Sequence, residues 1–247
     1  MIKPFKIIAP GIAFFILLVT SVQAPAGTGL YQDIPEKYQG IPVVPIPAIA
    51  NDSLPMAFLI SGDGGWSDFD YSIGKSLANR GIPVIGLDAR KYFWNFKTPE
   101  VTTNEVINAI QYYRHLWKKS KFILIGYSFG ACIIPFIATR LPGEMKDSLT
   151  GIYGLSPDLT VDFEVHVVDM IGIRRAADSF KVPEEMSKIK AFRPVCIFGD
   201  GEDAALRTRF TEAGAKVITV PGNHHYNFKA DAPAEVIFRE VAALRIK

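Results

Sequence analysis

Short apolar runs alternate along this chain with longer segments in which apolar residues recur at helical spacing. The strand-like runs cover residues 55–61, 83–88, 121–125, 149–155, 194–199 and 215–220. The helix-like segments between and after them cover residues 68–80, 99–118, 131–141 and 232–245. Strands that alternate with helices form mostly parallel sheets with helices on both faces. The pattern therefore predicts an α/β fold whose globular domain begins at residue 55 and runs to residue 247.

The N-terminal 26 residues have a different pattern. Lys3 and Lys6 precede an apolar run over residues 7–19, and the small residues Ala24 and Ala26 follow it. A positive start, a short apolar run and an A-x-A-like site are typical of a secretory signal peptide, here cleaved after Ala26. An uncleaved membrane anchor is the alternative, although the run is short for a span.

Residues 27–54 form an N-terminal extended segment, rich in proline and glycine, before the domain. Within it, residues 41–48 resemble a strand but contain three prolines. Because proline cannot donate to a sheet ladder, we expect an edge strand or an extended arm there. Export to an oxidising compartment would permit a disulfide between Cys132 and Cys196, but two separate buried thiols are the favoured interpretation.

Composition narrows the class further. Of the 247 residues, 49% are hydrophobic and 21% are charged, which is typical of one globular domain with a substantial core. The leader holds two lysines and no acid, so without it the net charge falls from +2 to 0. With no cluster of lysine and arginine either, the sequence gives no indication of a nucleic-acid partner.

A G-x-S-x-G motif stands between one predicted strand and the next helix, as Gly126-Tyr-Ser128-Phe-Gly130. In this context the serine sits on a tight turn that exposes its Oγ, and the glycines leave room for the neighbouring backbone. Free N–H groups at the following helix start favour the negative charge of acyl transfer. Ser128 is thus a candidate nucleophile, and a glycine-flanked structural turn is the alternative.

A candidate acid and a candidate base follow in the order expected for such a nucleophile. Asp203 comes after the strand-like run 194–199, and His224 comes after the run 215–220. Serine needs a base within hydrogen-bond reach, and the base needs a carboxylate that holds its tautomer. We therefore predict a catalytic triad of Ser128, Asp203 and His224.

Neighbouring residues leave alternatives open for both partners. Asp200 also lies in the acid loop, and Glu202 is a weaker third candidate for the acid. His225 is the alternative base, although His224 follows Gly-Asn as catalytic histidines do in comparable loops. Two adjacent histidines are also compatible with a solvated loop or a metal site. No second ligand set stands at metal spacing, so we predict neither a metal nor a cofactor.

The loop at residues 61–65, Ser-Gly-Asp-Gly-Gly, follows the first strand of the domain. An oxyanion hole needs one N–H from the residue after the nucleophile and another from an early strand–helix loop. Phe129 and Asp63 are the predicted donors. A glycine-rich turn without this role is the alternative, and a phosphate-binding loop is not supported because no nucleotide-binding glycine pattern is present.

Several longer strings resemble the VirJ/AcvB bacterial virulence proteins, a branch of the α/β-hydrolase superfamily. They are the segments at 61–66, 91–94 with 98–100, 126–131 with 135–136, 163–166 and 221–226. The resemblance implies an α/β-hydrolase fold with a small cap or none, and a periplasmic hydrolase. AcvB-like members are reported to hydrolyse lysyl-phosphatidylglycerol, and VirJ-like members are linked to virulence and type IV secretion. By this resemblance Ser128, Asp203 and His224 correspond to the presumed triad of the family.

The implied substrate suggests further contacts. A lysyl ester carries two ammonium groups, so its site should offer carboxylates and aromatic faces. Asp63, Asp68 and Asp70 follow the first strand, and the aromatic run Tyr92–Trp94 follows the second. Of these, Asp68, Tyr92 and Trp94 are the predicted substrate-binding residues. The alternative is that the acids cap the helix near residue 69 and the aromatic residues pack internally.

The sequence thus predicts a periplasmic serine ester hydrolase whose partner is a membrane phospholipid or another ester. Secretion-system proteins are further partners that the resemblance implies. A general esterase or lipase is the alternative within the same class. A non-catalytic docking or chaperone-like factor is the alternative from another class, because a fold alone does not define a function.

Overall fold

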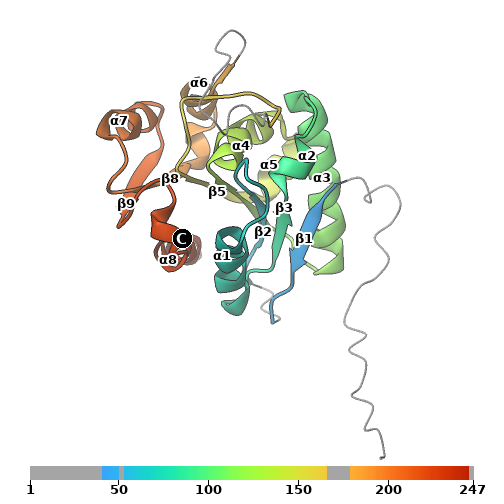
Figure 1. Cartoon of the computed structure of the whole chain (residues 1–247). Coiled ribbons are helices and arrows are strands. Elements are labelled where there is room, and N and C mark those ends of the chain that lie inside the picture. Colours follow the sequence, from blue (N-terminus) through green and yellow to red (C-terminus); the bar gives the residue numbers. More distant parts are fainter. Residues whose placement is uncertain (1–40, 50–52, 166–178, 245–247) are drawn as a thin grey trace, which may run out of the picture. The chain divides into compact units, whose positions relative to one another are not determined.

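The computed structural model describes residues 41–49, 53–165 and 179–244 (Figure 1). The predicted leader and its cleavage site lie outside these residues, as do most of segment 27–54 and His166. No helix within the described ranges is long and apolar enough to cross a membrane.

The described residues form a mostly parallel seven-stranded sheet with the order β1-β3-β2-β4-β5-β8-β9. Its strands are β1 (Val43–Ile46), β2 (Met56–Ile60), β3 (Val84–Leu87), β4 (Phe122–Tyr127), β5 (Leu149–Leu155), β8 (Val195–Gly199) and β9 (Lys216–Val220). Only β1 is antiparallel, and it pairs with β3 at one edge of the sheet. The prediction of a parallel sheet with a proline-containing edge strand is confirmed.

Helices cover both faces of this sheet (Figure 1). They are α1 (Asp68–Asn79), α2 (Ala89–Tyr92), α3 (Pro99–Leu116), α4 (Phe129–Arg140), α5 (Gly143–Ser148), α6 (Val182–Ser187), α7 (Ala204–Glu212) and α8 (Asp231–Ala243). One apolar cluster joins α1 and α8 to one face through residues such as Ile73 and Ile237. A second joins α3, α4, α6 and α7 to the other face through residues such as Ile110 and Ile134.

Smaller elements complete the described chain. Two short strands, β6 (Thr160–Val161) and β7 (Phe180–Lys181), pair in antiparallel fashion apart from the main sheet. Two 3₁₀ helices cover Lys190–Phe192 (η3) and Tyr226–Phe228 (η4). Cys132 and Cys196 are both buried and form no disulfide, in agreement with the favoured interpretation of two separate thiols.

The sequence explains why these elements begin and end where they do. The residues of β2 and β3 are buried throughout, as expected for central parallel strands covered on both faces. Helix α1 begins with a capping box, in which Ser67 and Asp70 satisfy each other's backbone N–H groups. Helix α3 begins at Pro99, as predicted, after the N-cap Thr98.

The parallel sheet sets the position of the candidate site. Strands β2, β3, β4, β5, β8 and β9 run in the same direction, so the loops after them leave the same edge of the sheet. In open α/β sheets, ligands bind at this carboxyl-terminal edge. Every predicted triad and oxyanion residue follows one of these strands.

Candidate active site

Ser128 stands on a strained turn between β4 and α4. Its backbone has φ +50° and ψ −113°, a conformation that residues other than glycine rarely adopt. The flanking glycines are sterically required. A Cβ at Gly126 would lie 2.3 Å from the carbonyl carbon of Gly130, and one at Gly130 would lie 2.2 Å from the oxygen of Ile60. This tight packing holds the serine at the carboxyl-terminal edge of the sheet, as expected for the sharp strand–helix turn known as a nucleophile elbow.

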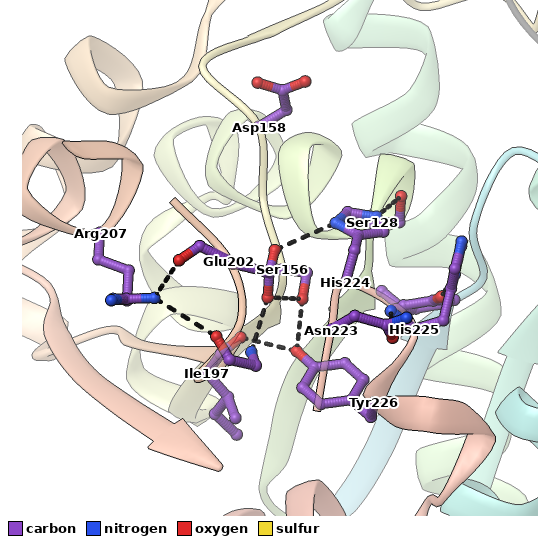
Figure 2. A network of polar contacts seen from close by, with 12 residues as sticks. Ser128, Ser156, Asp158, Ile197, Glu202, Arg207, Asn223, His224, His225 and Tyr226 are labelled. Atoms are coloured by element: carbon purple, nitrogen blue, oxygen red, sulfur yellow. Dashed lines mark hydrogen bonds and ion pairs between the residues drawn. The ribbon is translucent and has the colours of Figure 1, made fainter. Parts of the chain in front are cut away.

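The hydroxyl of Ser128 contacts the histidine predicted as its base. Ser128 Oγ lies 2.9 Å from His224 Nε2, which is hydrogen-bond distance (Figure 2). His224 belongs to the loop after β9, where Asn223 Oδ1 accepts the N–H groups of His225 and Asn227. The structure therefore brings together two residues that are far apart in the sequence.

The neighbouring histidine has a different partner. His225 Nδ1 lies 2.6 Å from the hydroxyl of Tyr127, and its ring stacks on Phe228 at a centroid distance of 5.6 Å. Among the described residues, His225 makes no hydrogen bond to Ser128. The geometry thus favours His224 over His225 as the base.

The structure corrects the expectation for the acid, because Glu202 and not Asp203 faces the histidine. Glu202 Oε2 lies 3.1 Å from His224 Nδ1. Asp203 is instead the N-cap of α7, where its carboxylate accepts the N–H of Ala205 at 2.8 Å. Asp200 accepts the N–H of Gly222 at 2.9 Å. The weakest of the three sequence candidates therefore occupies the acid position.

The physical reason for this correction lies in the turn after β8. The N–H of Glu202 donates to Gly199 O at 3.1 Å, so the chain turns back before the helix begins. Arg207 holds the same turn, because its guanidinium donates to the carbonyl of Glu202 at 2.5 Å. Asp203 then starts α7 and satisfies a free helical N–H, as aspartate commonly does at an N-cap.

A buried polar network fixes the other oxygen of Glu202. Glu202 Oε1 accepts the hydroxyl of Ser156 at 2.7 Å and the N–H of Gly199 at 2.6 Å (Figure 2). Ser156 Oγ also lies 2.8 Å from the hydroxyl of Tyr226, which donates to Ile197 O at 2.7 Å. Both carboxylate oxygens of Glu202 thus have partners, and its side chain is only 6% exposed.

These contacts determine the charge of the carboxylate. Burial alone would raise the pKa of Glu202, but hydrogen bonds from His224, Ser156 and the Gly199 N–H outweigh it. The pKa of Glu202 is therefore below its ordinary value. An ionised carboxylate beside Nδ1 is what a catalytic histidine requires, since it favours the tautomer with a proton on Nδ1.

Sequence reasoning missed Ser156 and Tyr226. Both have positive φ, at +49° and +52°, and the two residues after Tyr226 share this conformation. Strained backbone of this kind persists where surrounding structure holds it, and it is common at functional sites. Tyr226 could have been found, because it is the last residue of the VirJ/AcvB-like string at 221–226. The indication for Ser156 was weaker, namely that this residue directly follows the strand β5.

The loop after β2 lies beside the nucleophile. A Cβ built at Gly62 would lie 3.7 Å from Ser128 Cβ, and Ser61 O accepts the N–H of Gly130 at 3.2 Å. Within the described part of the chain, the amides of Asp63 and Phe129 have no hydrogen-bond acceptor. These two amides are therefore free to act as the predicted oxyanion donors.

The predicted substrate contacts separate into exposed and buried residues. Asp68 is exposed in the first turn of α1, and Trp94 is 52% exposed after α2. Tyr92, by contrast, is only 4% exposed. Its hydroxyl donates to Glu105, and Lys97 Nζ lies 4.6 Å from its ring centre. The expectation that Tyr92 contacts substrate is therefore corrected, because its side chain packs inside the domain.

Asp70 is not available to a substrate either. It is 1% exposed and accepts hydrogen bonds from both the N–H and the hydroxyl of Ser67. Burial raises the pKa of Asp70 despite these hydrogen bonds. The alternative interpretation, in which an acid caps the first helix, is correct for this residue. Of the acids after β2, Asp63 and Asp68 remain exposed.

A serine on a strained strand–helix turn, with an acid and a histidine after later parallel strands, defines the α/β-hydrolase fold. Solved structures share this fold. The chain is similar to Est1E from Butyrivibrio proteoclasticus, with a TM-score of 0.53, 15% identity, and coverage of 83% of this chain and 96% of that chain. It is also similar to proline iminopeptidase from Mycobacterium smegmatis, with a TM-score of 0.59 and 12% identity. That match covers 83% of this chain and 95% of that chain.

A third similar structure is XC6422 from Xanthomonas campestris, described as an α/β serine hydrolase without a lid. It has a TM-score of 0.52 and 13% identity, with coverage of 81% of this chain and 88% of that chain. No curated protein sequence matches the chain significantly. Residues 55–244 match the family described as "Bacterial virulence protein (VirJ)". The chain belongs to this VirJ family.

Proposed function

We propose that this protein is a serine hydrolase that cleaves carboxylic esters through an acyl-enzyme on Ser128. The observation that carries this proposal is the continuous chain of contacts from Glu202 through His224 to Ser128, at 3.1 and 2.9 Å. Serine becomes nucleophilic at neutral pH only beside such a base. The geometry supplies that base in a protein family that adopts the α/β-hydrolase fold.

The first half of the reaction forms the acyl-enzyme. Ser128 Oγ attacks the ester carbonyl carbon while His224 Nε2 takes the hydroxyl proton, and the carbonyl oxygen becomes an oxyanion. Glu202 stabilises the imidazolium that forms. The amides of Asp63 and Phe129 donate to the oxyanion. When the tetrahedral intermediate collapses, the bond to the alcohol oxygen breaks and His224 returns the proton to that oxygen.

The second half releases the acid. A water molecule attacks the acyl carbon, and His224 Nε2 takes its proton, so that the histidine again acts as base. The bond between the acyl carbon and Ser128 Oγ then breaks, and the proton passes to Ser128. The net change is one ester and one water converted into one alcohol and one carboxylic acid. The enzyme returns to its starting state without any cofactor.

The leading candidate substrate is an aminoacyl-phosphatidylglycerol, with lysine as the amino acid. The resemblance to AcvB-like proteins supports this choice, and so do the exposed carboxylates of Asp63 and Asp68 near the loop after β2. Carboxylates attract the ammonium groups of a lysyl ester more than a neutral acyl group. The signal-peptide pattern and the resemblance together support a periplasmic location, with virulence or type IV secretion as the setting.

A comparison of two substrates tests this proposal. Purified protein without residues 1–26 is assayed with lysyl-phosphatidylglycerol and with a short neutral ester. Hydrolysis of both, abolished in Ser128→Ala and retained in Ser187→Ala, is expected. Ser187 is a suitable control because it is exposed on α6 and, among the residues that the structure describes, its hydroxyl donates only to Glu184 O. Hydrolysis of the neutral ester alone would indicate a general esterase. No hydrolysis by folded protein would contradict the proposal.

A further inference from the structure

An open groove of about 640 Å³ lies beside the loop after β2. One wall comes from that loop, including Gly64 and Gly65. The other comes from the segment after β3, including Arg90, Lys91 and Trp94. Strands β2 and β3 are parallel neighbours, with Ile60 opposite Leu87. The groove therefore opens at the same edge of the sheet as Ser128.

The loop that forms one wall of the groove also approaches Ser128. Gly64 follows Asp63, whose amide is the proposed oxyanion donor, and Gly62 approaches the side chain of Ser128. A Cβ at Gly64 would meet nothing within 4 Å, so the space above this residue is open. The loop after β2 therefore borders both the side chain of Ser128, at Gly62, and the groove, at Gly64 and Gly65.

The charge of the groove is positive. Asp88 is a lining acid, but it is 10% exposed and its carboxylate is satisfied by Lys91. Oδ1 accepts the Lys91 N–H at 3.1 Å, and Oδ2 lies 3.2 Å from Lys91 Nζ. Arg90 is exposed and has no acidic partner within the described ranges. Lys91 offsets Asp88, so Arg90 leaves one uncompensated positive charge.

The second wall is held in place by backbone contacts. The N–H of Val165 donates to Phe93 O at 2.7 Å, and the N–H of Lys97 donates to Phe163 O at 3.0 Å. Phe93 itself is fully buried, whereas Trp94 beside it is 52% exposed. The exposed indole and Asn95 therefore stand on a fixed segment, which lowers the entropic cost of binding a ligand.

We propose that this groove binds a phosphate group of the substrate, with Arg90 as its main ligand. A guanidinium can bind two phosphate oxygens at once. Trp94 offers an apolar surface for the carbon atoms next to the phosphate. The exposed Asp63, a candidate for the ammonium group, is not among the residues that line the groove. The placement beside a scissile ester rests on the proposed function, whereas phosphate binding itself does not.

Binding is measured on the Ser128→Ala chain, in which no turnover occurs. The probe is glycerol phosphate, with glycerol as its uncharged control, and the readout is tryptophan fluorescence. We expect glycerol phosphate to bind and Arg90→Gln to weaken it about tenfold. Arg239→Gln is the matched control, since Arg239 is an exposed arginine on α8 outside the groove. Equal affinities in the Arg90→Gln and parent chains would overturn the proposal, as would equal weakening by both variants.

Vesicles distinguish a lipid phosphate from a soluble one. If the site serves a lipid headgroup, phosphatidylglycerol vesicles bind more tightly than glycerol phosphate, and Arg90→Gln weakens both. If the site serves a soluble phosphate ester, phosphatidylglycerol vesicles bind no more tightly than glycerol phosphate. Binding to vesicles that is independent of Arg90 would contradict the proposed site. Circular dichroism verifies that each variant is folded.

Turnover separates this inference from the proposed function. In the catalytically intact chain, Arg90→Gln should raise KM about tenfold for a phosphate-bearing ester and leave a neutral short ester unchanged. If no ester of any kind is cleaved, the proposed function fails while the binding experiment still stands. If esters are cleaved but Arg90→Gln affects both substrates equally, the groove proposal fails alone.

Discussion

Replacing Glu202 by glutamine should nearly abolish activity, whereas Asp203→Asn should leave it almost unchanged. Glu202 Oε1 accepts two hydrogen bonds, from Ser156 and from the N–H of Gly199. A glutamine would keep its carbonyl oxygen there and direct its NH₂ group at His224 Nδ1. Nδ1 must then accept, so the proton moves to Nε2. A protonated Nε2 cannot take the proton of Ser128.

The expected loss follows from this change of tautomer. Removing the charge of a triad acid in other serine hydrolases lowers kcat by about 10⁴, or about 5.5 kcal/mol in the activation barrier. Asp203→Asn keeps a good N-cap for α7, so its effect on stability should be a few tenths of a kcal/mol. Its effect on kcat should be less than about twofold.

The assay is kcat and KM for a short neutral ester, which tests the triad without depending on the natural substrate. Both variants are compared with the parent chain after their unfolding curves have been measured. A loss of activity in Asp203→Asn that exceeds the loss in Glu202→Gln would refute the assignment of the acid.

Three further predictions concern the Ser156–Glu202 hydrogen bond, the pKa of Glu202 and the packing of Gly130. Ser156→Ala should lower kcat about tenfold with KM unchanged, because it removes one charge-assisted hydrogen bond from Glu202; an unchanged kcat would contradict this role. The lowered pKa of Glu202 stabilises the fold above about pH 4.3, its unfolded value, and this contribution is lost as pH falls through the lower folded pKa. Urea unfolding between pH 7 and pH 3.5 should therefore show a smaller loss of stability in Ser156→Ala than in the parent. Gly130→Ala should destabilise the domain by more than about 3 kcal/mol, because its Cβ would lie 2.2 Å from Ile60 O. Gly143→Ala, where a Cβ meets nothing within 4 Å, should stay within about 0.5 kcal/mol in the same unfolding assay.

The elements that sequence predicted well are those dictated by short-range rules. The turn at Ser128 could be inferred because two glycines stand where a strand and a helix approach closely. The edge position of β1 was one of the two outcomes expected from Pro45 within it and Pro42 and Pro47 beside it, because proline cannot donate to a sheet ladder. The parallel direction of most strands followed from the alternation of strands and helices.

The identity of the acid could not be predicted by the same rules. Three acids follow β8, and their roles depend on where the turn ends and where α7 begins. Gly199 O and Arg207 fix that turn through contacts that no local pattern records. Asp203 caps α7 and the residue before it, Glu202, faces His224, so the start of the helix separates the two roles. The sequence alone therefore favoured Asp203, with Asp200 as the alternative and Glu202 only as a weaker third candidate.

The aromatic run after β3 shows a similar limit. Its residues are consecutive and alike in character, so composition does not tell which side chain points inward. The short helix α2 directs Tyr92 and Phe93 into the core and leaves Trp94 exposed. The role of Ser156 could not be predicted from local sequence patterns either, because its hydrogen bond to Glu202 joins loops after two different strands.

The most direct test of the account is the reaction of the folded protein with a fluorophosphonate, which modifies only activated serines. The parent chain is compared with Ser128→Ala and with Glu202→Gln. We predict rapid labelling of the parent, none of Ser128→Ala, and strongly slowed labelling of Glu202→Gln. Absence of labelling in the folded parent chain, or labelling that persists in Ser128→Ala, would contradict the claim that Ser128 is the nucleophile.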